Sequence, residues 1–436
     1  KLTGGYHKDF YGQPGSLSDA ELNTLGRKGA VYLNDKAKTE DWFTTISPNV
    51  KIDSSIGNVD ILTDVIYRSR RTNSSAYERT MFTTNHIKSF GVLPKIAVST
   101  AAFGVENRLL AGFDYYKHTD EILSGYAGSE DSINIKKESI GMYVTDTINI
   151  TEPFSINIGG RAEWAEYTFD QQAVAVDYHK KNPFEYAYDT GLNYMYNSKS
   201  SVYAKYDRSF RFPAVDEWYN ALWVSGAMKG GGLNLALKPQ TANDYEIGIK
   251  DNSSKYLGVR AAYFLSDIRH ELFLDPDPAP GLNQVYPHTV HHGLELETHA
   301  YLFESFDAFF NYTYTKAYFV GGKYAGNQLP LVSRNKFSAG VDYTFKDCVN
   351  INVVVNYMGP RYMSNDQRNI MPKLKANTTV NGRISYKKEY FEIFFACNNV
   401  FGEKYFDTAV TNSTGSSTKY YPAPETSFFA GVIYGF

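Results

Sequence analysis

Apolar and polar side chains alternate along the chain from about residue 41 to its end. In 349–357, Val-Asn-Ile-Asn-Val-Val-Val-Asn-Tyr, the odd positions are apolar and three of the four even ones are Asn. Successive side chains of a strand point to opposite faces, so one face suits lipid and the other suits water. The same rhythm places Arg161 and Glu163 together on one face of 155–170. Repeated along the chain, this pattern predicts an all-β fold, a transmembrane antiparallel β-barrel.

The pattern resolves into about eighteen predicted strands separated by short turns and long polar loops in alternation. The predicted strands are 2–12, 42–54, 58–70, 81–97, 107–118, 133–150, 155–170, 183–196, 201–212, 241–251, 256–272, 287–302, 305–319, 332–345, 349–361, 373–387, 390–406 and 419–436. Long loops are predicted at 13–41, 119–132, 171–182, 213–240, 273–286 and 407–418. Outer-membrane barrels place short turns at the periplasm and long loops outside, so the first strand runs outward and the last returns.

Composition narrows the class of protein. No apolar run approaches the roughly 18 residues that a membrane-spanning helix needs, which excludes a helical membrane protein. Tyr, Phe and Trp make up 16% of the residues, which fits aromatic girdles at the two membrane interfaces. The net charge of -3 gives no indication of nucleic-acid binding. An aromatic-rich soluble sandwich is the alternative, but it would not alternate along the whole chain.

The last predicted strand ends in alternating apolar residues. Counting back from the carboxy terminus, these are Phe436, Tyr434, Val432, Ala430 and Phe428. The pattern resembles the terminal signature by which outer-membrane barrels are recognised for membrane insertion. The resemblance implies the barrel assembly machinery as a partner.

Several segments, in order, resemble one family. They are Tyr-Asp-Arg-Ser-Phe-Arg-Phe-Pro-Ala-Val-Asp-Glu at 206–217, Leu-Lys-Pro-Gln-Thr-Ala-Asn-Asp-Tyr-Glu-Ile-Gly-Ile-Lys at 237–250, Gly-Leu-Glu-Leu-Glu at 293–297, Leu-Pro-Leu-Val-Ser-Arg-Asn-Lys-Phe at 329–337 and Asn-Asn-Val-Phe-Gly-Glu-Lys-Tyr at 398–405. Together they resemble landmarks of TonB-dependent outer-membrane receptors, of the siderophore-receptor type. One departure is Ser333, where the family usually has Pro.

The resemblance implies a receptor in the outer membrane of a Gram-negative cell. Barrels of this family have about 22 strands around a plug, so we expect 1–436 to be the C-terminal part of the barrel, without the plug domain and the first strands. The implied function is import of a scarce ligand, a ferric siderophore or similar metal chelate. The implied partners are the TonB–ExbB–ExbD complex, reached through a plug that is not in this chain, and the small-molecule ligand. Corrinoids, other cofactors or oligosaccharides as ligand, a separate plug polypeptide, and a passive eighteen-strand porin stay open.

Candidate site residues lie on the expected mouth and lumen. The candidates for ligand binding are Arg211, Trp218, Tyr219, Trp223, Tyr286, His288, Arg361 and Tyr362. The candidates that face the lumen and, by resemblance, hold the plug are Arg161, Glu163, Lys205, Asp207, Arg260, Glu295 and Glu297. An extracellular girdle of aromatic residues is the alternative for the rings.

The sequence carries no enzyme motif, and we expect neither catalytic residues nor a cofactor. Neighbours on a strand face opposite ways, so His291 and His292 cannot both bind one metal ion, and no metal site is predicted. Arg68 and Arg70 share a face at the outer rim, where guanidinium groups suit lipopolysaccharide and lipid headgroups or an anionic ligand.

Overall fold

The computed structural model describes residues 1–55, 57–76, 78, 80–102, 105–126, 129–173, 176–224, 227–275, 282–412 and 414–435. Within these ranges, the side chains of 102, 176–178, 220–224 and 227–231 are not described. Phe436 therefore lies outside the described residues, as does the side chain of Trp223. All statements below about counts or absences refer to this part of the chain.

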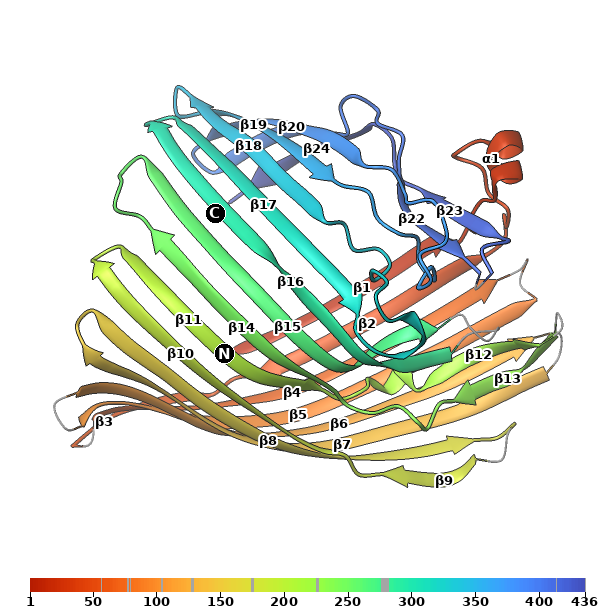
Figure 1. The fold of residues 1–436 in the computed structure, drawn as a ribbon, viewed down its shortest axis with the longest axis horizontal. Coiled ribbons are helices and arrows are strands. Elements are labelled where there is room, and N and C mark those ends of the chain that lie inside the picture. The colour runs from red at the N-terminus through yellow and green to blue at the C-terminus, as the bar shows by residue number, and fades with distance from the viewer. Residues whose placement is uncertain are drawn as a thin grey trace.

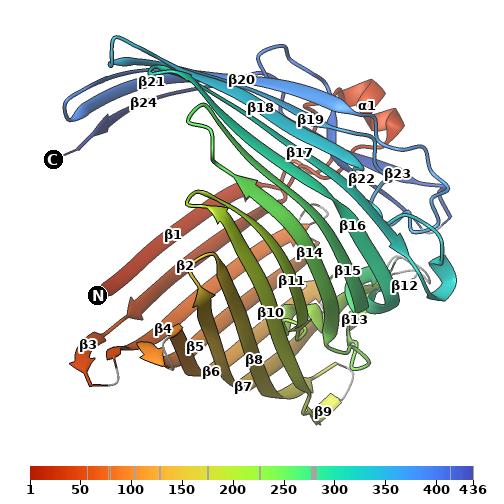
Figure 2. The same ribbon diagram turned by 60° about the vertical axis from the view of Figure 1, so that its left-hand side comes forward.

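Twenty strands of the described residues form one antiparallel sheet that curls around a central space (Figures 1 and 2). Two of them, β3 and β9, are short and pair at the ends of β4 and β8, which leaves eighteen wall strands and confirms the predicted architecture. In order around the sheet, the wall strands are β1 (Leu2–Gly12), β2 (Lys36–Ile46), β4 (Gly57–Ala76), β5 (Met81–Ala102), β6 (Val105–Tyr126), β7 (Ser129–Thr151), β8 (Phe154–Gln171), β10 (Phe184–Asn197), β11 (Ser200–Arg211), β14 (Gln240–Asp251), β15 (Leu257–Asp275), β16 (Leu282–Phe303), β17 (Phe306–Phe319), β18 (Asn335–Phe345), β19 (Val349–Met358), β20 (Asn377–Lys388), β21 (Phe391–Asn398) and β24 (Ser427–Tyr434).

The remaining elements are short. They are α1 (Asp19–Leu25), β3 (Asn49–Ser54), β9 (Val176–Lys181), the 3-10 helix η1 (Val215–Glu217), β12 (Tyr219–Val224), β13 (Ala227–Leu233), the 3-10 helix η2 (Gly322–Tyr324), β22 (Phe406–Thr411) and β23 (Thr418–Pro422). Apart from β3, they belong to the longer connections, which share one end of the barrel (Figure 1). No helix in the described ranges is long and apolar enough to cross a membrane.

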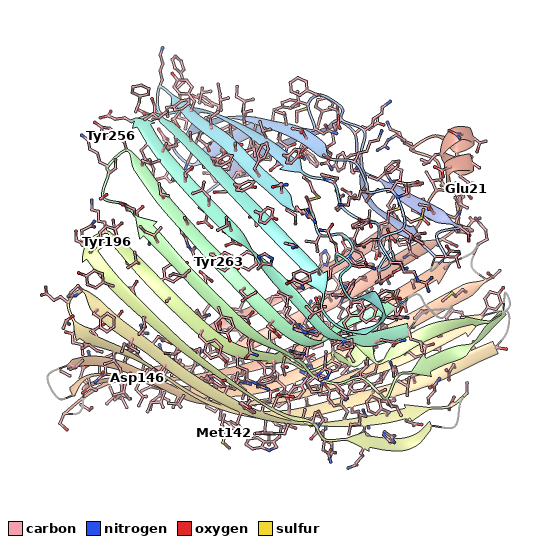
Figure 3. The ribbon with its side chains drawn as sticks, in the orientation of Figure 1. Glu21, Met142, Asp146, Tyr196, Tyr256 and Tyr263 are labelled. Carbon is pink, nitrogen blue, oxygen red and sulfur yellow. The ribbon has the colours of Figure 1, made fainter. Side chains whose placement is uncertain are left out.

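Cross-strand pairing assigns the two faces of the wall, because directly opposed residues share a face. Ile351 opposes Ile384, which opposes Phe395, and all three are exposed on the outer surface. On the other face, Arg383 donates to Glu392 at 2.5 Å. The predicted alternation of a lipid-facing and a lumen-facing surface is therefore present in the sheet. Figure 3 shows Met142 pointing outward, and Tyr196 and Tyr256 at the end with the short turns.

Several strand boundaries differ from the prediction. The segment predicted as one strand at 42–54 is divided between β2 and β3, because Pro48 has no N–H to donate and interrupts the pairing. In addition, β2 starts earlier than predicted, at Lys36. The segment 119–132, predicted as a long loop, is instead mostly paired strand in β6 and β7. Likewise 419–436 divides into β23 and β24, with Pro422 and Pro424 at the interruption. The end with the long connections is thus built more from paired strands than from irregular loops.

The sheet has two edges, β1 and β24, and no β1–β24 pairing occurs within the described residues. The connections that follow β1 and precede β24 nevertheless meet. Leu17 forms an antiparallel bridge with Tyr420, and Lys419 donates to Glu21 at 2.8 Å. We call these four residues the clasp. They join the connection after β1 to the connection before β24, although the two strands themselves do not pair.

Candidate functional site

One side of the lumen mouth is closed by an inward fold of the chain after β11. Trp218 is 2% exposed and packs between Tyr167 and Phe169, with ring centroids 5.0 and 4.9 Å away. The Tyr167 hydroxyl donates to the Pro213 carbonyl at 2.6 Å. We call this region the apolar wall. Its buried residues are Ile122, Ile133, Ile135, Ala165, Tyr167, Phe169, Phe212, Val215, Trp218 and Leu237.

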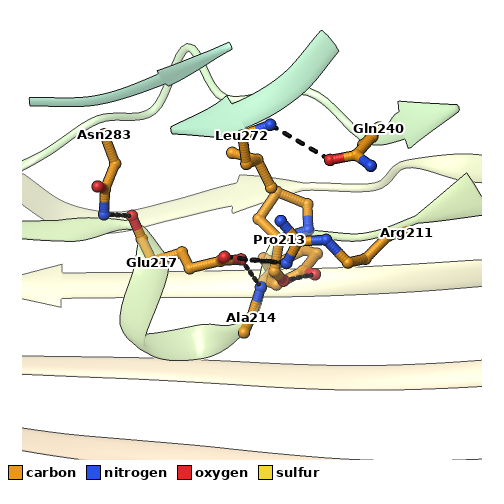
Figure 4. A network of polar contacts seen from close by, with 8 residues as sticks. Arg211, Pro213, Ala214, Glu217, Gln240, Leu272 and Asn283 are labelled. Carbon is orange, nitrogen blue, oxygen red and sulfur yellow. Dashed lines mark hydrogen bonds and ion pairs between the residues drawn. The ribbon is translucent and has the colours of Figure 1, made fainter. Parts of the chain in front are cut away.

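A polar network fixes the turn that carries Trp218 (Figure 4). Arg211 donates to the Glu217 carboxylate at 2.8 Å, and the same carboxylate accepts from the Ala214 amide at 2.7 Å. Asn283 donates to the Glu217 carbonyl at 2.9 Å. A carboxylate that accepts backbone N–H groups at the start of a helical turn stabilises that turn. Arg211 therefore holds the fold of this segment in the structure, and a role in ligand binding stays a prediction.

The mouth has a contrasting side across the lumen, on β17 to β20 (Figures 1 and 2). A pocket of roughly 600 Å³ opens there between the strands and the connections above them. We call this region the donor wall. Its lining residues are Asn311, Thr313, Leu331, Lys336, Phe337, Ser338, Asn356, Tyr357, Met358, Arg361, Asn377, Thr379, Tyr405 and Asp407. Most of the polar groups are amides, hydroxyls and cations, and Asp407 is the one carboxylate in this set.

Of the residues predicted to bind a ligand, Arg361 lines this pocket. It is 4% exposed, and its Nη2 donates to the Phe406 and Asp407 carbonyls at 3.0 and 2.7 Å. Burial lowers the pKa of Arg361 below its usual value. Its Nη1 is buried without a hydrogen-bond partner in the described structure. Arg361 thus anchors the start of β22 while part of its guanidinium group stays unused.

The segment 359–376, which carries Arg361, is well anchored. Asp366 accepts from the amides of Ile370 and Met371 at 2.9 and 3.1 Å. Burial raises the pKa of Asp366, although these amides oppose the shift. Asn369 donates to the Gln328 carbonyl at 2.9 Å. The mouth on this side is therefore a defined surface built on backbone hydrogen bonds.

Other predicted ligand-binding residues lie apart from this pocket. Tyr286 is buried against Phe319 and Tyr324. His288 contacts Asp267 at 3.0 Å, and alternation along β16 places it on the outer face, opposite to His291. Tyr219 packs on the apolar wall, and the Tyr362 ring lies under the Lys373 ammonium. The Trp223 side chain lies outside the described residues. Their roles toward a ligand stay predictions.

The predicted lumen charges form ion pairs on the inner face. Arg161 contacts Asp114 and Glu163 at 2.6 and 2.7 Å. Lys205 contacts Asp207 at 2.7 Å. Arg260 lies 3.9 Å from Glu297, and Glu295 follows the same alternation on β16. Their role in holding a plug stays a prediction.

Arg68 and Arg70 do share a face, and it is the lumen face. On β4 they alternate with Asp64, which faces the lumen with Asp114 and Arg161. Arg68 pairs with Asp41 on β2. This placement does not support contact between the two guanidinium groups and lipid headgroups.

Sequence reasoning missed Lys336 and Asn377 on the donor wall. Lys336 opposes Met358, and Met358 opposes Asn377, so the three form one row across β18, β19 and β20. The motif at 329–337 contained Lys336, but only the strand register brings it near Asn377. Among the described residues, no group of three or more His, Cys, Asp or Glu side chains could hold a metal ion.

The curved antiparallel sheet, the lipid-compatible outer face and the polar lumen define the class: an outer-membrane β-barrel. Residues 2–400 match the sequence family described as TonB dependent receptor-like, beta-barrel. The chain belongs to this family, and it is an outer-membrane protein of the Gram-negative type.

Individual relatives agree with the family. The ferrichrome outer membrane transporter/phage receptor of Escherichia coli K12 is 24% identical over 294 residues, which cover 60% of this chain and 36% of that protein. The chain thus spans about a third of this relative's length.

Solved structures share the fold. The ferric citrate transporter FecA, in its unliganded form, has a TM-score of 0.78 at 16% identity, covering 98% of this chain and 66% of that one. The ferric yersiniabactin uptake receptor FyuA from Yersinia pestis has a TM-score of 0.77 at 14% identity, covering 100% and 68%. These relatives are transporters and receptors, which agrees with the prediction that the chain is not an enzyme.

Proposed function

We propose that this chain is the barrel of a receptor that imports a metal chelate, a ferric siderophore first among the candidates. The observation that carries the proposal is the donor wall, a pocket of roughly 600 Å³ at the lumen mouth of a TonB-dependent receptor barrel. Small-molecule sites are concave and occupy about 300–1,000 Å³. The relatives named for ferrichrome, ferric citrate and ferric yersiniabactin support iron chelates over corrinoids and oligosaccharides.

Each side of the mouth has a part in this function. The ligand enters from outside and rests against the donor wall, while the apolar wall narrows the passage on the other side. Lumen charges such as Arg161 and Glu163 hold a plug domain by ion pairs and hydrogen bonds. The TonB–ExbB–ExbD complex acts on the plug to open a path, and the hydrogen-bonded sheet stays rigid during that step.

The open edges bear on the domain organisation. A barrel in lipid must satisfy its edge N–H and C=O groups, and β1 and β24 pair on one side only among the described residues. The two edges are antiparallel, so an even number of further strands fits between them. We propose four such strands and a plug, contributed by polypeptide additional to residues 1–436.

The outer face above the apolar band carries charge pairs such as Lys117 with Glu138, at 2.6 Å. Lipopolysaccharide phosphates suit such ammonium groups. We include lipopolysaccharide and the barrel assembly machinery among the proposed partners. The carboxy-terminal face that would present Phe428, Val432 and Tyr434 to that machinery is exposed.

Uptake of radioactive iron tests the proposal. Cells that carry the full receptor as their sole iron-chelate receptor are starved of iron and given Fe(III) complexes of several classes, with and without functional TonB. We expect saturable uptake of at least one complex that stops without TonB. Solute flux that needs no TonB, together with steady conductance in planar bilayers, would instead identify a passive porin.

A further inference from the structure

The donor wall holds hydrogen-bond donors that the protein itself does not use. Arg361 Nη1 and Asn377 Nδ2 are both buried without a partner in the described structure, and the two residues are 4% and 8% exposed. Both line the same pocket. A buried donor without a partner costs free energy, and the cost is greater for a charged group. Two such donors at one pocket indicate that an acceptor belongs there.

Charge in the pocket favours an anionic acceptor. Lys336 is exposed on the same lumen row as Asn377 and makes no ion pair with any carboxylate of the described residues. Arg361 also hydrogen-bonds to carbonyls and not to a carboxylate. Asp407 is the one acidic side chain in the lining, so the two cations leave the pocket net positive. Guanidinium, ammonium and amide donors together match the oxygens of a carboxylate.

We propose that the pocket formed by Lys336, Arg361 and Asn377 binds a carboxylate group, presented by a carboxylate-bearing metal chelate. This inference rests on the proposed function and names the chemical class of its ligand. The ligand's carboxylate sits over the Lys336–Asn377 row, and Arg361 turns its unused Nη1 toward it. The pocket volume of roughly 600 Å³ suits a whole small molecule. An acidic side chain of a plug domain is the other source of the same chemistry.

Binding to the full receptor in detergent tests the proposal, with citrate, Fe(III)–citrate and the neutral Fe(III)–trihydroxamate ferrichrome as probes. We expect Lys336→Gln to weaken binding of the citrate probes by about tenfold, because it removes one charge-assisted contact. Asn377→Asp keeps the side-chain shape but replaces a donor with a carboxylate, so it should weaken binding further. Ferrichrome binding, if present, should not change in either variant.

Lys316→Gln is the matched control. This substitution removes the same charge from the neighbouring strand β17. Lys316 itself lies on the outer face, over the Tyr318 ring. It should leave binding of every probe unchanged. Equal citrate binding by the wild type and the Lys336 and Asn377 variants would overturn a soluble carboxylate as the occupant.

A second measurement separates the two sources. If citrate does not bind the wild type, but Lys336→Gln and Asn377→Asp make the plug more sensitive to protease while Lys316→Gln does not, the carboxylate comes from the plug and the site stands. If neither citrate binding nor plug protection changes, the carboxylate site is refuted. TonB-dependent uptake of ferrichrome that persists in every variant would leave the proposed function standing on its own. If the Lys336 and Asn377 variants lose citrate binding but no chelate is taken up in a TonB-dependent way, the carboxylate site stands and the proposed function is refuted.

Discussion

The two sides of the mouth share one barrel but differ in what fills them. On the apolar wall, Trp218 is packed between the rings of Tyr167 and Phe169, and burial stabilises an inward fold of the chain. On the donor wall, the polar groups of Lys336, Arg361 and Asn377 line an open pocket, and part of their hydrogen-bonding capacity is unused. Buried polar atoms without a partner in the described structure occur on both walls, Trp218 Nε1 among them, so the difference lies in the open pocket and its net positive lining. Under the proposed function, one side narrows the passage by packing and the other presents its donors to a ligand.

The largest effect should follow from removing the ring at the centre of the apolar wall. Trp218→Ala leaves a cavity beside Tyr167, and such truncations cost about 3–5 kcal/mol. Hydrogen exchange of the amides of 212–219 should speed up, and small solutes should leak through the receptor more readily. Trp164→Ala is the control, because Trp164 is 49% exposed on the outer face and should leave this exchange unchanged. Unchanged exchange in Trp218→Ala would mean that packing does not hold the inward fold.

On the donor wall, a smaller loss is expected for Arg361→Lys. The ammonium keeps the charge, but both hydrogen bonds to the Phe406 and Asp407 carbonyls come from the guanidinium Nη2, which the shorter Lys side chain cannot place in the same position. Since the Lys ammonium can still reach one of the two carbonyls, the expected cost is that of one hydrogen bond to a charged group, about 1.5–3 kcal/mol. We expect faster hydrogen exchange in 405–411 and no change in 212–219. Equal acceleration in both segments would show that the two walls are coupled rather than independent.

A still smaller effect is expected for Glu217→Gln on the apolar side. Arg211 is about half exposed, so its ion pair with Glu217 contributes no more than about 1 kcal/mol. The amide keeps an oxygen for the Ala214 N–H, so the turn should survive. We expect a slight rise in hydrogen exchange at 214–218, well below that of Trp218→Ala. A rise as large as in Trp218→Ala would show that the polar network, not ring packing, fixes this wall.

The smallest effect concerns the clasp, which lies beside the donor wall. The Lys419 ammonium and the Ser18 hydroxyl lower the pKa of Glu21 from 4.5 to about 2. A carboxylate with a lowered pKa contributes stability above its unfolded value, and this contribution is lost as pH falls from about 4.5 toward 2. We expect hydrogen exchange in α1 to rise over that range in the wild type. Glu21→Gln should remove the pH dependence, and an unchanged profile in this variant would exclude Glu21 as its source.

The sequence alone was sufficient to predict the strands in the region where one face of each strand meets lipid. The alternation in 349–357 predicted β19 closely, because the membrane imposes a strict two-residue period there. Beyond the membrane both faces of a strand can meet water or protein, so this period disappears. In 119–126, Asp120 faces the lumen and Glu121 faces outward, and the polar run was therefore predicted as a loop. It is paired strand in the structure.

The site was less predictable because its residues are combined by register. Arg361 was a candidate from its place at the end of a strand, while Lys336 and Asn377 became neighbours only through β19. Trp218 was expected to offer its ring to a ligand, whereas the structure buries it. No local pattern distinguishes a ring that packs on the wall from one that faces the passage. That distinction depends on how 212–224 and 227–237 fold back, a long-range property.

The length of β5, β6 and β7 has a consequence for recognition at the cell surface. Strands of 22 residues, at about 3.3 Å per residue and a tilt of about 40°, rise roughly 55 Å along the barrel axis, against an apolar band of about 25 Å. Much of the surface outside the bilayer is therefore paired sheet. An antibody raised against this face would recognise side chains from adjacent strands, so its epitopes are conformational. Linear peptides from 80–90 or 119–126 would therefore be poor immunogens for raising antibodies against this face.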